Sequence, residues 1–217
     1  MNHLQILILS FSILIPAVVS LIRIKKIEPA FYPFIFCIWV ATTNEIFSAI
    51  LTSFNINTAV NNNIYVLTEA ILIGWQFKNW GLFRSYKYAF NVYVLLVVLV
   101  WMFETSFLTE LHLINGTFRI SYSFLIVLMS ILVNNKLIYH HKGKLLKSPV
   151  FIIGTGLIFY FTFKIFIEAF LLYGITVSPG FYKNLFVILA WINVFTNVLF
   201  AYAILCIPKK IYYIDPF

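Results

Sequence analysis

Long apolar stretches, each of about the length that crosses a membrane, recur along the whole chain. An α-helix rises about 1.5 Å per residue, so about 20 apolar residues cross about 30 Å of hydrocarbon. The sequence therefore predicts an all-α, polytopic membrane protein built as a bundle of seven transmembrane helices. The predicted spans are residues 4–22, 30–54, 60–78, 88–108, 115–135, 149–173 and 182–207.

The composition excludes a water-soluble globule. Hydrophobic residues make up 62% of the 217 positions and charged residues only 10%, whereas about 25% of an ordinary soluble domain is charged. Short tails and loops remain outside the spans, which leaves no room for a soluble kinase, nucleotide-binding or DNA-binding domain. We expect residues 1–217 to form a single seven-helix domain in the cell membrane, or in the inner membrane of a bacterium.

Basic residues fall on alternate loops and on the C-terminal tail. The loops near residues 55–59, 109–114 and 174–181 contain no Lys or Arg. The positive-inside rule then predicts the N-terminus outside and the C-terminus in the cytosol. The net charge of +8 is thus explained mostly by the membrane topology, and we expect no nucleic-acid partner. The loop and tail residues concerned are Arg23, Lys25, Lys26, Lys78, Arg84, Lys87, Lys136, Lys142, Lys144, Lys147, Lys209 and Lys210.

These basic loops are expected to face membrane lipids with anionic headgroups, or a cytosolic or membrane protein partner. Neither a metal nor a cofactor is expected, because an intramembrane zinc site needs histidine ligands within the helices. Cys37 and Cys206 map toward the reducing cytosolic side, which argues against a disulfide. The four histidines lie outside the spans or at their ends: His3, His112, His140 and His141.

Lys78, Glu104 and Lys183 lie at or near the ends of predicted spans, and five other charged residues fall deeper inside. A charge at membrane depth costs about 2.5–3.5 kcal/mol on insertion scales, so each is a candidate functional residue. Three are carboxylates and two are cations, and Lys183 at the outer end of the last span would balance the sum. Lys164 and Glu168 are one turn apart and could also neutralise each other. The five residues are Glu45, Glu69, Arg119, Lys164 and Glu168.

Polar residues share a helical face with these charges, at about 100° per residue. This pattern predicts one pocket in the outer half of the bundle, with Arg119 as a clamp for a carboxylate or phosphate. The first and fourth spans carry few polar residues and are expected to face lipid more. The predicted ligand-binding residues are Glu45, Glu69, Arg119, Lys164, Glu168, Asn44, Tyr65, Tyr122, Tyr160 and Asn193.

The pocket favours a receptor-like or transport-type protein that binds a small polar or zwitterionic ligand. An intramembrane acid–base enzyme that uses Glu45 and Glu69 is an alternative, although no Ser–His or Cys–His pair accompanies them. A channel in which Glu69, Gln76 and Asn197 extend a proton path is another alternative. In a structural subunit of a larger complex, the polar residues would only bond between helices.

Overall fold

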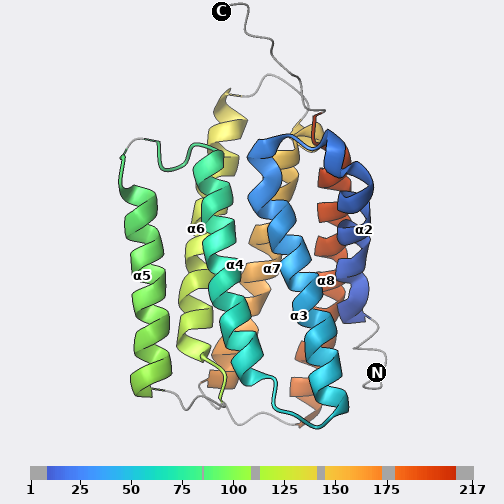
Figure 1. Ribbon diagram of the computed structural model, residues 1–217, viewed down its shortest axis with the longest axis vertical. Coiled ribbons are helices and arrows are strands. Elements are labelled where there is room, and N and C mark those ends of the chain that lie inside the picture. Colours follow the sequence, from blue (N-terminus) through green and yellow to red (C-terminus); the bar gives the residue numbers. More distant parts are fainter. Residues whose placement is uncertain (1–8, 85, 109–112, 141–144, 173–178, 209–217) are drawn as a thin grey trace, which may run out of the picture.

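The computed structural model describes residues 9–84, 86–108, 113–140, 145–172 and 179–208. Within these residues the chain is helical, with seven α-helices and no strand, which confirms the predicted all-α bundle (Figure 1). The α-helices are α2 (Leu14–Arg23), α3 (Tyr32–Ser53), α4 (Ala59–Asn79), α5 (Ala89–Phe103), α6 (Gly116–His140), α7 (Pro149–Leu172) and α8 (Pro179–Cys206).

Shorter helical turns adjoin these helices. A 3₁₀ turn, Phe11–Ile13, precedes α2, and a π-helical turn, Glu104–Leu108, extends α5. Three further 3₁₀ turns lie in the connections: Ile24–Lys26, Pro29–Phe31 and Leu145–Lys147.

Five of the described helices are long and apolar enough to cross a membrane. α4 has a similar length but a more polar sequence, since it carries Asn61, Asn62, Asn63, Glu69 and Lys78. The five spans are Pro29–Ser53, Ala89–Leu108, Gly116–Tyr139, Pro149–Leu172 and Asn184–Cys206.

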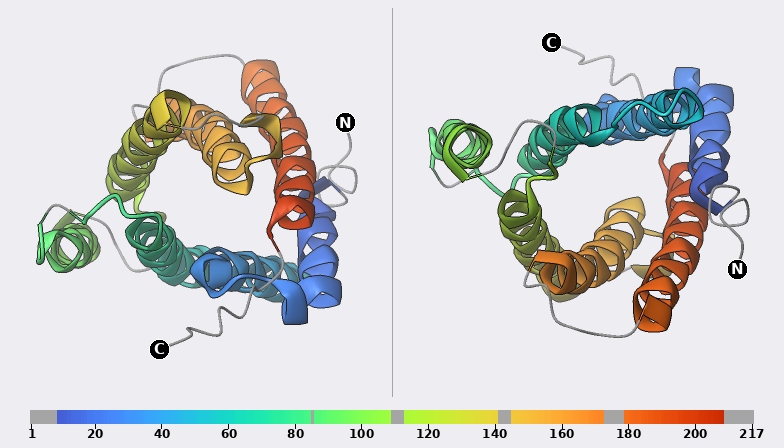
Figure 2. Two further views of the ribbon diagram at one scale, coloured as in Figure 1. Left: turned by 90° about the horizontal axis from the view of Figure 1, so that it is seen from above. Right: turned by 90° about the horizontal axis from the view of Figure 1, so that it is seen from below.

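Six of the helices form a closed ring. Each of α2, α3, α4, α6, α7 and α8 packs on the next in that order, and α8 packs on α2. Figure 2 shows this ring from both ends, with α5 outside it. The fourth span is therefore peripheral, as the sequence predicts. α2 closes the ring between α3 and α8, and it also exposes apolar side chains such as Val18, Leu21 and Ile22 on its outer face.

α5 is attached to α4 by two hydrogen bonds and one close approach. Tyr93 Oη donates to the carbonyl of Ala70 (2.9 Å), and Trp101 Nε1 donates to that of Asn63 (2.9 Å). The ring of Tyr93 lies over Gly74, where a Cβ would overlap it. The outward side chains of α5 are apolar and exposed, as expected of a face toward lipid.

The connections that carry basic residues gather at one end of the bundle, at the top of Figure 1. We call this the basic end; its described parts lie within residues 24–31, 80–88 and 145–148. Arg23 donates there to carbonyls at the end of α8, those of Ile204 (3.1 Å) and Leu205, and to that of Ile207 (3.1 Å) just after the helix. A cation at a helix C-terminus is favourable because the carbonyls carry partial negative charge. Which face of the membrane the basic end occupies stays a prediction.

Candidate functional site

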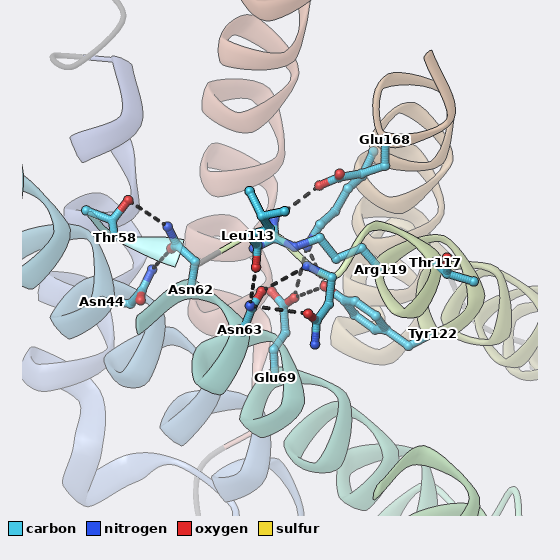
Figure 3. A network of polar contacts seen from close by, with 12 residues as sticks. Asn44, Thr58, Asn62, Asn63, Glu69, Leu113, Thr117, Arg119, Tyr122 and Glu168 are labelled. Atoms are coloured by element: carbon cyan, nitrogen blue, oxygen red, sulfur yellow. Dashed lines mark hydrogen bonds and ion pairs between the residues drawn. The ribbon is translucent and has the colours of Figure 1, made fainter. Parts of the chain in front are cut away.

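The predicted polar residues meet inside the ring, in its middle and in the half away from the basic end. Glu45 follows the start of α3 by about 20 Å, and Lys164 follows that of α7 by about 22 Å, at 1.5 Å per residue. Figure 3 shows the polar contacts among residues of α3, α4, α6 and α7. The inward faces of these helices thus contribute to one polar region.

Glu69 is at the centre of this region and is only 5% exposed. Its Oε1 accepts a hydrogen bond from Tyr65 Oη (2.6 Å), and its Oε2 accepts one from Tyr122 Oη (2.6 Å). Lys164 Nζ lies 3.2 Å from the same Oε2 and also donates to Tyr122 Oη. Two hydroxyls and one ammonium therefore compensate the buried carboxylate, as a buried charge requires.

Aromatic rings surround the Lys164 ammonium. Nζ lies 5.0 Å from the centre of the Tyr122 ring, 5.2 Å from that of Phe161 and 5.6 Å from that of Tyr160. The negative faces of such rings attract a cation within about 6 Å. The Lys164 charge is thus held by Glu69 and by the π systems of α6 and α7.

Arg119 and Glu168 form the second ion pair. Arg119 Nη1 lies 3.1 Å from Glu168 Oε1, and the two side chains are 12% and 13% exposed. Arg119 Nε is buried without a hydrogen-bond partner. The prediction that Lys164 and Glu168 could neutralise each other is wrong, because each pairs with a residue of another helix. Ring packing brings Glu69 to Lys164 and Arg119 to Glu168, which the spacing along one helix does not reveal.

Glu45 differs from the other two carboxylates. Among the described residues no Lys, Arg or His nitrogen lies within 4.0 Å of it, and its hydrogen-bond partner is the Ser10 side chain. The Lys183 side chain, expected to balance the charge, lies outside the described residues. The described cluster therefore holds three carboxylates and two cations.

Two cavities adjoin this cluster and share the walls formed by Glu45, Tyr65 and Tyr160. We call them the aromatic cavity (about 100 Å³) and the polar cavity (about 160 Å³), and together the chamber. Other aromatic-cavity residues include Phe34, Cys37, Ala41, Glu69, Phe161, Asn193, Thr196 and Phe200. Other polar-cavity residues include Asn44, Asn62, Arg119, Lys164 and Glu168.

Of the predicted ligand-binding residues, only Tyr122 lies outside the walls of these two cavities. It is 1% exposed and contacts the cavity-lining Glu69 and Lys164 through its hydroxyl. Asn44 lines the polar cavity, but its amide also ties α3 to α4, accepting from Asn61 Nδ2 (2.8 Å) and donating to Asn62 Oδ1 (3.3 Å). Asn193 lines the aromatic cavity, and its Oδ1 accepts from Asn197 Nδ2 (3.3 Å).

Several lining residues were missed as candidates. Ser10 comes from the segment before α2, which was expected to face lipid. Cys37 and Thr196 lie on the polar faces of their helices, so helical phase could have predicted that they line the chamber. Thr196 is 1% exposed, and its Oγ1 has no hydrogen-bond partner. The chamber wall thus contains an unsatisfied hydroxyl.

Glu104 is a further buried carboxylate, which the sequence places at the membrane boundary. It is 3% exposed and accepts hydrogen bonds from the backbone N–H groups of Thr117 (2.9 Å) and Phe118. These are donors of the first turn of α6, which have no partner within the helix. Glu104 therefore caps α6 and takes no part in the chamber.

The comparisons with known proteins match no family model, no curated protein and no solved structure. Within the described residues, no three His, Cys, Asp or Glu side chains are grouped to hold a metal ion. The fold is all-helical, and several of its apolar helices could span a membrane, which is consistent with a multi-pass membrane protein.

Proposed function

We propose that this protein binds a small polar or zwitterionic ligand in the chamber, as a sensor or a transport-type membrane protein. The observation that carries the proposal is the pair of cavities lined by Glu45, Arg119 and Lys164, which come from three helices. Ligand sites combine an apolar concave wall with a few placed polar groups, and the chamber has this composition.

The polar cavity offers the contacts that an anionic group of the ligand needs. Arg119 and Lys164 both line it, and the buried Nε of Arg119 has no partner. A guanidinium can bind a carboxylate or phosphate through two parallel N–H groups. Glu45, in the wall shared with the aromatic cavity, supplies the opposite charge for a zwitterion.

A purely structural role accounts less well for the cluster. A structural role would account for the ion pair of Glu69 with Lys164 and for that of Glu168 with Arg119. They leave Glu45 without a cation and leave two cavities where a core would be filled. A buried ion pair is also often no more stabilising than apolar residues of similar size.

A proton path toward the basic end receives little support. Gln76 Oε1 accepts from the Phe34 N–H (2.9 Å), and its Nε2 donates to the Ala30 carbonyl (2.8 Å). This amide therefore satisfies the start of α3. Ile73 and Leu157 give the aromatic cavity apolar walls. For the acid–base enzyme, the one favourable observation is that Glu45 and Glu69 line the same cavity.

The test is ligand-dependent thermal unfolding of the purified full chain in lipid nanodiscs, with amino acids and small amines as probes. We expect at least one zwitterionic or charged probe to raise the melting temperature of the wild type. Ala41→Phe, which fills the aromatic cavity, should remove that shift, because the added ring occupies the ligand volume.

The matched control is Val92→Phe, which adds the same ring at an exposed position of α5 and should keep the shift. A set of probes that never stabilises the wild type, or a shift that survives Ala41→Phe, contradicts the proposal. Uptake of the active probe into proteoliposomes would assign transport; binding without uptake would assign sensing.

A further inference from the structure

The aromatic cavity has two acidic side chains but no basic one in its described wall. Glu45 and Glu69 both line it, whereas Arg119 and Lys164 line only the polar cavity. We propose that the aromatic cavity binds the ammonium group and apolar body of a small organic amine, with Glu45 as the counter-ion. This inference rests on the proposed function and names the chemical class of its ligand.

Charge compensation is the first argument. Glu69 and Glu168 each have a cation nitrogen within 3.2 Å, whereas Glu45 has none within 4.0 Å in the described part of the chain. Glu45 is half-buried, and leaving a carboxylate uncompensated away from bulk water is costly. An ammonium bound against Glu45 supplies the missing positive charge.

The cavity wall is the second argument. Phe34, Tyr65, Tyr160 and Phe161 line the cavity, and aromatic faces attract a desolvated cation more strongly than an exposed one. The same rings offer apolar contact to a hydrocarbon chain. The wall around Glu45 therefore suits an alkylammonium better than a hydrated metal ion, which needs oxygen ligands.

The unsatisfied hydroxyl is the third argument. A primary ammonium has three N–H donors and no acceptor. Glu45 can accept one, and Thr196 Oγ1, buried in the same wall without a partner, can accept another. Asn193 adds a side-chain amide to the wall. Of these groups, Thr196 Oγ1 is the one that has no partner within the protein.

Cavity size limits the amine. A cavity of about 150 Å³ is known to hold benzene, and the aromatic cavity measures about 100 Å³. A chain of about four carbons is therefore a suitable probe. A ligand that carries a carboxylate as well would extend past the shared wall toward Arg119 in the polar cavity.

The experiment compares butylammonium, butan-1-ol and butyrate by thermal unfolding and by calorimetric titration of the full chain in nanodiscs. We expect wild type to bind butylammonium more tightly than the other two. In Glu45→Gln, which keeps the shape but not the charge, affinity for butylammonium should fall about ten- to hundredfold, the effect of losing a charge-assisted hydrogen bond. Affinity for butan-1-ol should not change.

Glu45→Asp keeps the charge on a shorter side chain and should retain part of the butylammonium affinity, which a merely structural role would not predict. Glu28→Gln, a neutralised carboxylate at the basic end, is the matched control and should behave as wild type. The wild-type titrations decide the question even if Glu45→Gln does not fold.

Equal wild-type affinity for butylammonium and butan-1-ol would overturn the inference, as would unchanged butylammonium affinity in a folded Glu45→Gln. Binding of butyrate or of an amino acid that Ala41→Phe abolishes, without butylammonium binding, would overturn it while leaving the proposed function standing. Failure of every probe to bind would count against both.

Discussion

At the residue scale, the carboxylates of the chamber differ in their partners. Glu69 and Glu168 each have a cation beside them, whereas Glu45 has none among the described residues. Tyr65, Tyr122 and Lys164 all bond to Glu69, so three helices are joined through a single carboxylate. Such a network is costly to break, because each remaining polar group would be buried without a partner. Glu45 has no comparable network; its hydrogen-bond partner is the Ser10 side chain, and we propose that a ligand ammonium compensates its charge.

Lys164→Met is expected to lower the free energy of unfolding by about 3–5 kcal/mol, because it leaves Glu69 charged and buried without a cation. The double variant Lys164→Met/Glu69→Gln should recover part of that loss, since the neutral Gln needs no cation, and its amide can accept a hydrogen bond from one tyrosine and donate one to the other. Denaturant titration in nanodiscs measures both. Losses that simply add would show that the two side chains are not coupled.

At the element scale, side chains of one helix satisfy the ends of another. Arg23 binds the C-terminus of α8, Gln76 binds the start of α3 and Glu104 binds the start of α6. Next to Glu104, Asn115 Nδ2 donates to Thr105 Oγ1 (2.6 Å) and its N–H donates to Asn63 Oδ1 (3.2 Å). These contacts satisfy backbone groups at helix ends that have no partner within their own helix.

Replacing Glu104 by Leu removes both acceptors at the start of α6. We expect a loss of about 1–2 kcal/mol of stability, the usual cost of a missing cap. Hydrogen exchange should become faster at the amides of Thr117 and Phe118. Glu104→Gln keeps one acceptor oxygen and should show a smaller change; unaltered exchange in Glu104→Leu would mean that the cap contributes little.

At the scale of the whole molecule, a six-helix ring surrounds the chamber while α5 stands outside. The ring brings together residues distant in sequence, such as Glu69 with Lys164. It also places the basic connections at one end, and the positive-inside rule predicts that this end faces the cytosol.

Single cysteines in a variant without Cys37 and Cys206 test this orientation. Ile56→Cys lies in the exposed turn between α3 and α4, and Tyr86→Cys lies in the exposed connection at the basic end. A membrane-impermeant maleimide applied to intact cells should label the first variant and reach the second only after permeabilisation. The reverse pattern would invert the predicted topology.

Much of the architecture was predictable from the sequence. The apolar runs determine the helical class, because a span must be about 20 residues long to cross hydrocarbon. Helical phase also identified most of the charged and polar residues of the chamber, since residues three and four apart share a face. The burial of Glu104 was missed, because its distance from a span end does not reveal that it reaches the start of α6.

The sequence by itself determined the all-α class with long apolar spans, and it placed five charges away from the span ends. Only the tertiary structure decided how those charges combine: Lys164 with Glu69, Arg119 with Glu168, and Glu45 with neither cation. The physical reason is that pairing depends on which helix faces meet in the ring. Periodicity along one helix specifies a face, but only packing between helices specifies its partner.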